Sequence, residues 1–243
     1  MRGIIPSDLL HHDLNAHGRE LGALKRFRIA YILNLCLALL EVLAPIWMSS
    51  GLVGGVLTTS GAEMFKFFTI DSNVLMGVIA LFTALQLRQV IRGQREDLST
   101  ACYVWYLAGT VGVTLTMLVT VFFLEPTMAP QFGLFALFAG SNFLLHLFNP
   151  LLAIVTFTVF EKTRKIPFRH TLTGIVPMVL YAVFYVANCM RHAVNGMVDI
   201  AYDWYGFLAG GVKTVWIVIP VIFLFTWLIS IALWRLNRRK TEK

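Results

Sequence analysis

Six long apolar runs divide most of this 243-residue chain. A bilayer core about 30 Å thick needs roughly 20 apolar residues in a helix, and every run reaches that length. Because lipid offers no hydrogen-bond partners to the backbone, a run that crosses it must be helical. We therefore predict an all-α polytopic membrane protein, a bundle of six transmembrane helices. The predicted spans are Phe27–Met48, Phe65–Leu87, Ala101–Leu124, Gln131–Phe160, Thr171–Ala193 and Val212–Leu236.

The composition agrees with this interpretation. Hydrophobic residues make up 58% of the chain and charged residues 14%, whereas soluble domains contain about 45–50% and about 25%. These values exclude a soluble enzyme, a disordered chain and a collagen-like fibre. The connections are too short for a separate soluble domain. We expect a polar cytoplasmic segment over residues 1–26, which could form a short amphipathic surface helix, a six-helix transmembrane domain over 27–236 and a basic tail over 237–243.

The positive charges indicate the orientation of the bundle. Seventeen of the 20 Lys and Arg residues lie in the second and fourth connections, or in the N-terminal segment and the C-terminal tail with the span ends next to them. Lys66, Arg191 and Lys213 lie on the other side. Cytoplasmic loops carry an excess of Lys and Arg, so both termini are predicted to be cytoplasmic. The net charge of +7 belongs to these membrane-flanking clusters, so we predict the lipid bilayer and no nucleic acid as a partner.

Polar side chains gather at two places within the apolar runs. Such groups are costly in lipid, so each is a candidate for function. In the second run, Thr69, Ser72 and Asn73 share one helical face, because they are three and four residues apart. In the fourth run, Asn142 and His146 are four residues apart and stack on one face.

Thr69 and His146 are expected at similar depths. Thr69 precedes the basic Arg88 by 19 residues and His146 precedes Glu161 by 15, which corresponds to roughly 28 Å and roughly 22 Å of helix. Pro150 has no N–H for the carbonyl of His146, so a kink is expected there. We therefore predict that Thr69 and His146 line one polar cavity in the outer half of the membrane.

Several other kinds of site have no support in the sequence. The three cysteines share no short spacing, which argues against disulfides and zinc. The histidines near the N-terminus are explained as an exposed polar tail. No phosphate-binding loop, nucleophile elbow or HExxH motif occurs. No metal and no cofactor are predicted.

Two motifs resemble those of a known family. Phe68-Thr69-Ile70-Asp71-Ser72-Asn73 is similar to the F-T-x-x-S-N opening of the second span in the androgen-induced-gene and androgen-dependent TFPI-regulating protein family, which includes bacterial members. The stretch from Asn142 to Pro150 is similar to the family's N-x-L-x-H-x-x-x-P element. The aromatic residues of the fifth span and of 202–207 resemble its later region. A bacterial-type member would lie in the inner (plasma) membrane.

The resemblance implies a six-span threonine hydrolase that cleaves fatty acid esters of hydroxy fatty acids, with a nucleophilic Thr69 and a general-base His146. A third group should orient the imidazole. Asn142 is the first choice, with Asp71 or Asp203 behind it. Asn73 or Ser72 could donate to the oxyanion. The alternatives are a non-enzymatic channel or small-solute transporter, or a membrane scaffold, that uses the same polar residues.

Overall fold

The computed structural model describes residues 7–51, 59–161, 163 and 166–238, with side chains from residue 21 onward. These described residues form helices and no β-strand, and six of the helices are long and apolar enough to cross a membrane. The predicted all-α bundle of six spans is confirmed. The observed spans are Leu21–Ser49, Phe68–Ile91, Thr100–Phe132, Ser141–Phe160, Phe168–Arg191 and Val212–Asn237.

The first two spans are long, continuous helices. Helix α1 extends over Ser7–Ser49, so residues 7–26 continue the first span instead of forming a separate surface helix. The short 3₁₀ turn η1, Gly61–Lys66, leads into α2, Phe68–Ile91. Gly77 of α2 lies against α1, and a Cβ added to it would be 2.9 Å from the Cβ of Glu41. Small residues allow this close approach of two membrane helices.

The third span is longer than predicted, and the predicted start of the fourth span is wrong. Helix α3, Thr100–Val119, continues through a π-helical turn, η2, Thr120–Leu124, into α4, Glu125–Phe132. The Glu125 carboxylate accepts hydrogen bonds from the backbone N–H groups of Phe135 and Leu137. The chain reverses after Phe132, at Gly133. Because N–H groups of the following turn bond to the Glu125 carboxylate, this acidic residue does not end the helix. Gln131 therefore belongs to the third span.

The remaining spans combine several helical types. After the 3₁₀ turn η3, Ala136–Phe138, the fourth span consists of α5, Ser141–Phe143, the π turn η4, Leu144–Phe148, α6, Asn149–Val155, and the π turn η5, Thr156–Phe160. The fifth joins η6, Phe168–Ile175, to α7, Val176–Arg191. The sixth joins η7, Val212–Thr214, to α8, Val215–Asn237.

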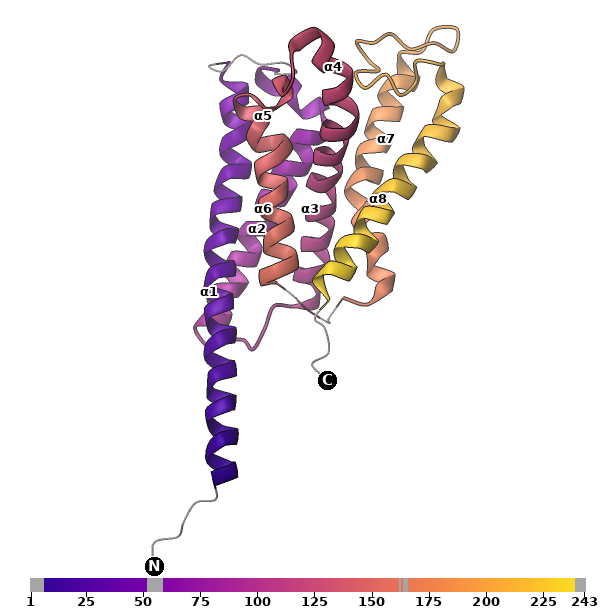
Figure 1. Ribbon diagram of the computed structural model, residues 1–243. Coiled ribbons are helices and arrows are strands. Elements are labelled where there is room, and N and C mark those ends of the chain that lie inside the picture. The colour runs from indigo at the N-terminus through magenta and orange to yellow at the C-terminus, as the bar shows by residue number, and fades with distance from the viewer. Residues whose placement is uncertain (1–6, 52–58, 162, 164–165, 239–243) are drawn as a thin grey trace, which may run out of the picture.

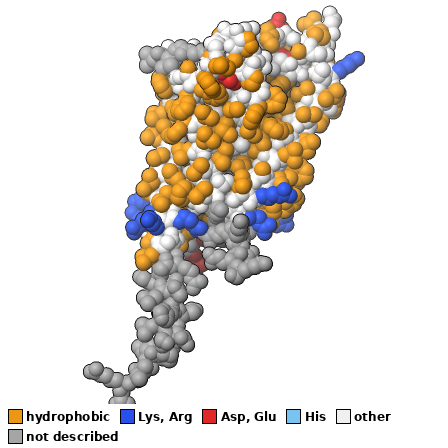
Figure 2. Space-filling model, in the orientation of Figure 1, with side chains coloured by type: hydrophobic (Ala, Val, Ile, Leu, Met, Phe, Trp, Pro, Cys, Tyr) orange, Lys and Arg blue, Asp and Glu red, His pale blue; other side chains and the backbone are white. Residues whose placement is uncertain are grey.

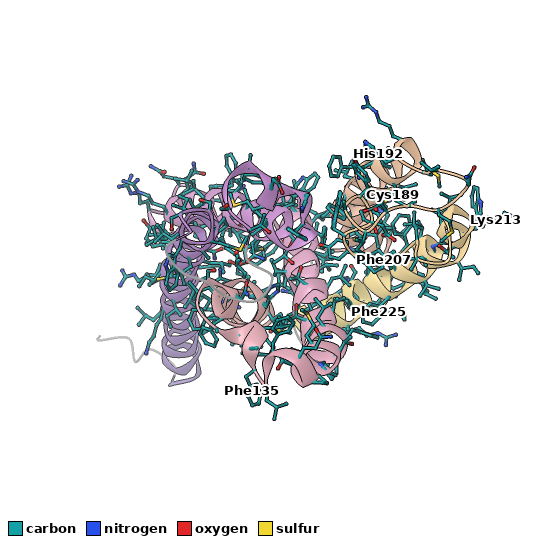
Figure 3. All side chains as sticks on the ribbon, turned by 90° about the horizontal axis from the view of Figure 1, so that it is seen from above. Phe135, Cys189, His192, Phe207, Lys213 and Phe225 are labelled. Atoms are coloured by element: carbon teal, nitrogen blue, oxygen red, sulfur yellow. The ribbon has the colours of Figure 1, made fainter. Side chains whose placement is uncertain are left out.

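Helix α3 is the centre of the bundle. Two thirds of its span (67%) is buried, against 22% for α8 at the periphery. Helices α7 and α8 separate from the other spans toward the end opposite the termini (Figure 1). Seen from above, the connection that carries His192 and Phe207 lies on the α7–α8 side, away from Phe135 (Figure 3). On the face shown in Figure 2, hydrophobic side chains form a broad apolar belt, and Lys and Arg side chains gather along its lower edge.

Candidate functional site

Two of the π-helical turns meet inside the bundle. His146 lies in the middle of η4 and Thr120 is the first residue of η2. The Oγ1 atom of Thr120 lies 3.0 Å from Nδ1 of His146. The π turn at His146 comes directly before α6, where Pro150 has no N–H to continue the regular ladder. Such turns occur often at functional sites, because the inserted residue redirects a side chain.

The imidazole of His146 is buried and held at one nitrogen. His146 is 6% exposed and Thr120 is 1% exposed. Within the described part of the chain, Nε2 of His146 has no hydrogen-bond partner. In a neutral imidazole one nitrogen donates and the other accepts. If Nδ1 donates to Thr120, Nε2 carries the lone pair of a base.

Thr120 was not singled out from the sequence, which favoured Asn142 as the orienting group. Asn142 is buried on the same helix, one turn before His146. Thr120 stands in an apolar helix that also holds Thr110, Thr114 and Thr116, which donate to carbonyls of their own helix. Only the three-dimensional contact distinguishes Thr120 from these neighbours.

Thr69 lies in the first turn of α2, half-buried, and its turn is connected to that of His146. The Nδ2 atom of Asn73 donates to the carbonyl oxygens of Thr69, at 2.8 Å, and of Leu145, at 3.3 Å. One amide group therefore joins the turn of Thr69 to the residue next to His146. No hydrogen bond links the side chains of Thr69 and His146, although both belong to the described residues.

The structure gives Asn73 and Ser72 different roles from the predicted oxyanion donors. Both N–H bonds of the Asn73 amide point to backbone carbonyls. The Ser72 hydroxyl lies 3.1 Å from the carbonyl of Thr69 and 3.2 Å from Oγ1 of Thr116. These hydrogen bonds hold the first turn of α2 in place.

Asp71 and Asp203 lie in two different environments. Asp71 lines a cavity of about 280 Å³ between α2 and α7. Asp203, 1% exposed, accepts hydrogen bonds from the Tyr185 hydroxyl and, at 2.9 Å, from the backbone N–H of Leu208. Neither aspartate has a hydrogen bond to His146 in the described structure, so the structure does not bring either of them to the imidazole.

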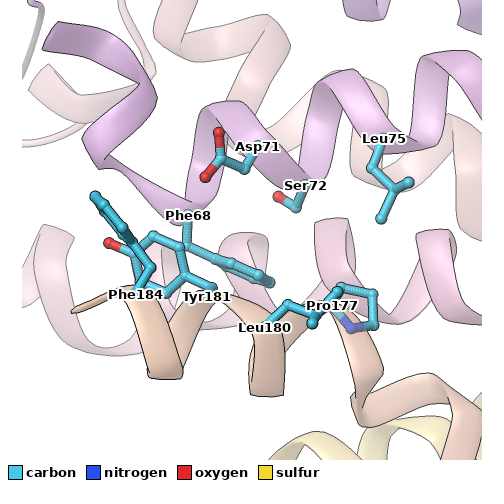
Figure 4. A pocket seen from close by; sticks show the side chains of 8 residues that line it. All are labelled: Phe68, Asp71, Ser72, Leu75, Pro177, Leu180, Tyr181 and Phe184. Atoms are coloured by element: carbon cyan, nitrogen blue, oxygen red, sulfur yellow. The ribbon is translucent and has the colours of Figure 1, made fainter. Parts of the chain in front are cut away.

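The cavity beside Asp71 is mainly apolar and lies between two spans. In Figure 4, side chains of α2 face side chains of α7 across it. Leu180 and Phe184 of α7 are 68% and 52% exposed on the outside of the bundle. The lining residues are Phe68, Asp71, Ser72, Leu75, Pro177, Leu180, Tyr181 and Phe184.

Aromatic residues of α7 and of the connection between α7 and α8 contact the end of α2 next to this cavity. This connection, residues 192–211, is called the outer connection because it lies at the end of the bundle opposite the termini (Figure 1). The Tyr205 hydroxyl accepts a hydrogen bond of 2.9 Å from the backbone N–H of Phe68. The Tyr181 hydroxyl donates to the Lys66 carbonyl at 2.6 Å and accepts from the Trp204 indole at 2.9 Å. These aromatics belong to the stretch that resembles the later region of the family, and their contacts connect them to the turn of Thr69.

The fold and the polar interior define a multi-pass integral membrane protein of six helices. Comparisons with protein-family models, curated proteins and solved structures gave no match to this chain. In the described residues, no three His, Cys, Asp or Glu side chains lie together in a way that could hold a metal ion. A functional proposal therefore depends on the geometry around His146 and on the motif resemblance.

Proposed function

We propose that this protein is an intramembrane hydrolase that cleaves ester bonds of lipids, with Thr69 as nucleophile and His146 as general base. The supporting observation is the buried imidazole, held at Nδ1 by Thr120 with Nε2 unpartnered, beside the turn of Thr69. Thr120 itself is only 1% exposed and contacts Nδ1, not the Nε2 that would act as the base. The half-buried Thr69 is the hydroxyl that a substrate can reach.

The chemistry follows from these positions. Nε2 of His146 takes the hydroxyl proton while Oγ1 of Thr69 attacks the ester carbonyl carbon. The imidazolium then gives this proton to the departing alcohol, which leaves an acyl-threonine. The backbone N–H of Thr69 lies in the first turn of α2, where helical N–H groups have no i−4 carbonyl. It is our candidate donor to the oxyanion.

The substrate class is proposed from the cavity between α2 and α7. Its apolar lining and its lipid-facing rim at Leu180 and Phe184 suit an acyl chain that enters laterally from the bilayer. Phe68 and Ser72 line the cavity and lie on either side of Thr69 in the sequence. An acyl chain in the cavity would therefore lie close to the nucleophile. A fatty acid ester of a hydroxy fatty acid, in the inner membrane of a bacterium, fits both this cavity and the family resemblance.

The deciding experiment is labelling with a fluorophosphonate, followed by peptide mapping of the modified residue. Thr69→Ala should lose both labelling and ester hydrolysis, while Thr69→Ser should keep part of each because the hydroxyl remains. His146→Gln should lower hydrolysis about 10²–10⁴-fold, the usual contribution of a positioned base. Thr158→Ala is the matched control, because the Thr158 hydroxyl donates only to the carbonyl of Ile154 in its own helix.

The second candidate function is a channel or transporter for a small solute. It is favoured by the two buried carboxyls Glu41 and Glu161, 0% and 2% exposed, because carboxyls inside a membrane bundle often mark ion pathways. If folded wild-type protein neither labels nor hydrolyses lipid esters, the hydrolase proposal fails and this candidate takes its place.

A further inference from the structure

Buried side-chain oxygen atoms without a hydrogen-bond partner occur at several places in the described structure, and five of them belong to two amide–carboxyl pairs and one tyrosine. These five lie on α1, on α3, in the fourth span and at Glu161 directly after it, in side chains that are 0–2% exposed. Buried polar atoms nearly always bond to protein or to ordered water, so each unpartnered atom needs an explanation. The atoms are Asn34 Oδ1, Glu41 Oε1, Tyr106 Oη, Asn149 Oδ1 and Glu161 Oε2.

Four of these atoms belong to two amide–carboxyl pairs. Asn149 donates to Glu41 at 3.2 Å, and Asn34 donates to Glu161. In each pair one carboxyl oxygen and the amide oxygen have no protein donor. Tyr106 of α3 is fully buried, and its hydroxyl is the fifth unpartnered atom. A small molecule that can both donate and accept hydrogen bonds would satisfy all of these atoms, because the Tyr106 hydroxyl is also a donor.

A single cation does not fit this arrangement. Asn34 and Glu41 are seven residues apart on α1, which places the two pairs about 10 Å apart along that helix. No single ion can contact both pairs at that separation. A row of small molecules can contact all of the atoms in turn, and each of them would find two or more polar partners. Buried water in proteins typically has two to four such partners.

The outer end of the row reaches the candidate site. Glu41 packs against Gly77, which is one helical turn after Asn73. Asn149 is three residues after His146. The inner end, at Glu161, lies one residue beyond the fourth span. Burial raises the pKa of Glu161 to about 8, so most Glu161 carboxyls are uncharged at neutral pH. An uncharged carboxyl binds water more readily than it binds a cation.

We propose that these side chains hold a file of water molecules that runs from the cytoplasmic end of the bundle to the turn of His146 and supplies the water that hydrolyses the acyl-enzyme. This inference depends on the proposed function. A water molecule attacks the acyl carbonyl carbon, and its proton passes to Nε2 of His146. The bond from the carbonyl carbon to Oγ1 of Thr69 then breaks, Thr69 takes the proton back, and a carboxylic acid leaves.

The test uses a variant in which one pair becomes apolar, Glu41→Met with Asn149→Leu. Replacing both partners avoids leaving a single buried charge, so the double variant should fold. Thr83→Val is the matched control, because it removes a buried hydroxyl that bonds to Ile79 and Cys102, outside the file. All proteins are the full chain in the same detergent or in liposomes.

The first measurement is radiolytic hydroxyl labelling, which modifies side chains that lie next to bound water. The buried ring of Tyr106 and the Phe157 ring that stacks on it should be labelled in wild-type protein and in the control, and this labelling should be lost in the double variant. The result does not require catalysis, so it tests the file even if the hydrolase proposal fails. Absence of labelling at both rings in wild-type protein would overturn the water file.

The second measurement is the time course of a chromogenic ester. The double variant should keep the initial burst, since acylation needs no water, but lose steady-state turnover and accumulate acyl-Thr69. Steady-state turnover at the wild-type rate would overturn the proposal. Sodium or proton flux through liposomes that disappears in the double variant would also overturn it, in favour of an ion pathway.

Discussion

The orientation of the His146 imidazole depends on a hydroxyl that lies 26 residues earlier in the chain. The Thr120 hydroxyl can accept a hydrogen bond from Nδ1 or donate one to it. When it accepts, Nε2 carries the lone pair and can act as a base. Both side chains are buried, so water does not readily replace the bond. Thr120 is therefore a positioning residue in the proposed mechanism and has no direct contact with substrate.

Replacement of Thr120 by valine tests this role. Thr120→Val should lower hydrolysis roughly fivefold or more, since a buried hydrogen bond contributes about 1 kcal/mol. Thr120→Ser should restore the rate. Nitrogen chemical shifts of ¹⁵N-labelled His146 should show a change of tautomer in the valine variant only. Thr114→Val is the control, because the Thr114 hydroxyl bonds to its own helix. Unchanged imidazole shifts in Thr120→Val would refute the positioning role.

Glu161 should make stability depend on pH. Burial raises its pKa from 4.5 to about 8, although its hydrogen bond with Asn34 lowers it in part. Between these values the folded chain keeps the proton and the unfolded chain loses it, so the free energy of unfolding falls as the pH rises. The melting temperature of wild type, relative to Glu161→Gln, should therefore fall between about pH 5 and about pH 8. Glu63→Gln is the control, because Glu63 is exposed; its melting temperature, measured by scanning fluorimetry, should change with pH as that of wild type does. If the melting temperature of Glu161→Gln also changes with pH in the same way as that of wild type, the prediction is contradicted.

At the scale of single elements, the start of α2 depends on a residue from the outer connection. The first N–H groups of a helix have no acceptors within it. In α2, the N–H of Phe68 donates instead to the Tyr205 hydroxyl. Thr69 is the next residue, so this contact holds the turn that carries the proposed nucleophile. The connection between α7 and α8 thereby influences the site without lining it.

Loss of this cap should have two measurable effects. Tyr205→Phe leaves the N–H of Phe68 without its acceptor, which costs about 1 kcal/mol and should lower the melting temperature by about 2–4 °C in a chain of this size. It should also slow ester hydrolysis. Tyr202→Phe is the matched control, because that ring stacks on His192 and the substitution preserves the stacking. Equal melting temperatures for the two variants would mean that the cap contributes nothing.

The sequence predicted elements better than contacts, for physical reasons. Hydropathy reports length in the bilayer, so the six spans were predicted. The spacing of Thr69, Ser72 and Asn73 predicted that they share one face of α2, where Ser72 and Asn73 both bond to the carbonyl of Thr69. Hydropathy is blind to Glu125, whose carboxylate is satisfied by N–H groups ten and twelve residues later. The contact between Thr120 and His146 depends on how two π turns pack, and no local pattern encodes that packing.

At the scale of the whole molecule, the apolar belt and the basic edge determine how the bundle can lie in a membrane. Helix α1 begins and α8 ends at the end where Lys and Arg side chains gather (Figure 2). The connection between α7 and α8 lies at the opposite end (Figure 1). Positive residues favour the cytoplasmic side, so this arrangement favours cytoplasmic termini and an outer connection in contact with the exterior.

Cysteine labelling in intact cells tests this orientation. Ile200 of the outer connection is 70% exposed, so Ile200→Cys should react with a membrane-impermeant maleimide added outside. A cysteine added after Lys243 should react only once the membrane is permeabilised. The unmodified chain is the control, since Cys102 and Cys189 are buried and the exposed Cys36 lies within the first span. The reverse pattern would place the termini outside, and the water file would then begin at the exterior face, because Glu161 lies at the same end of the bundle as the termini.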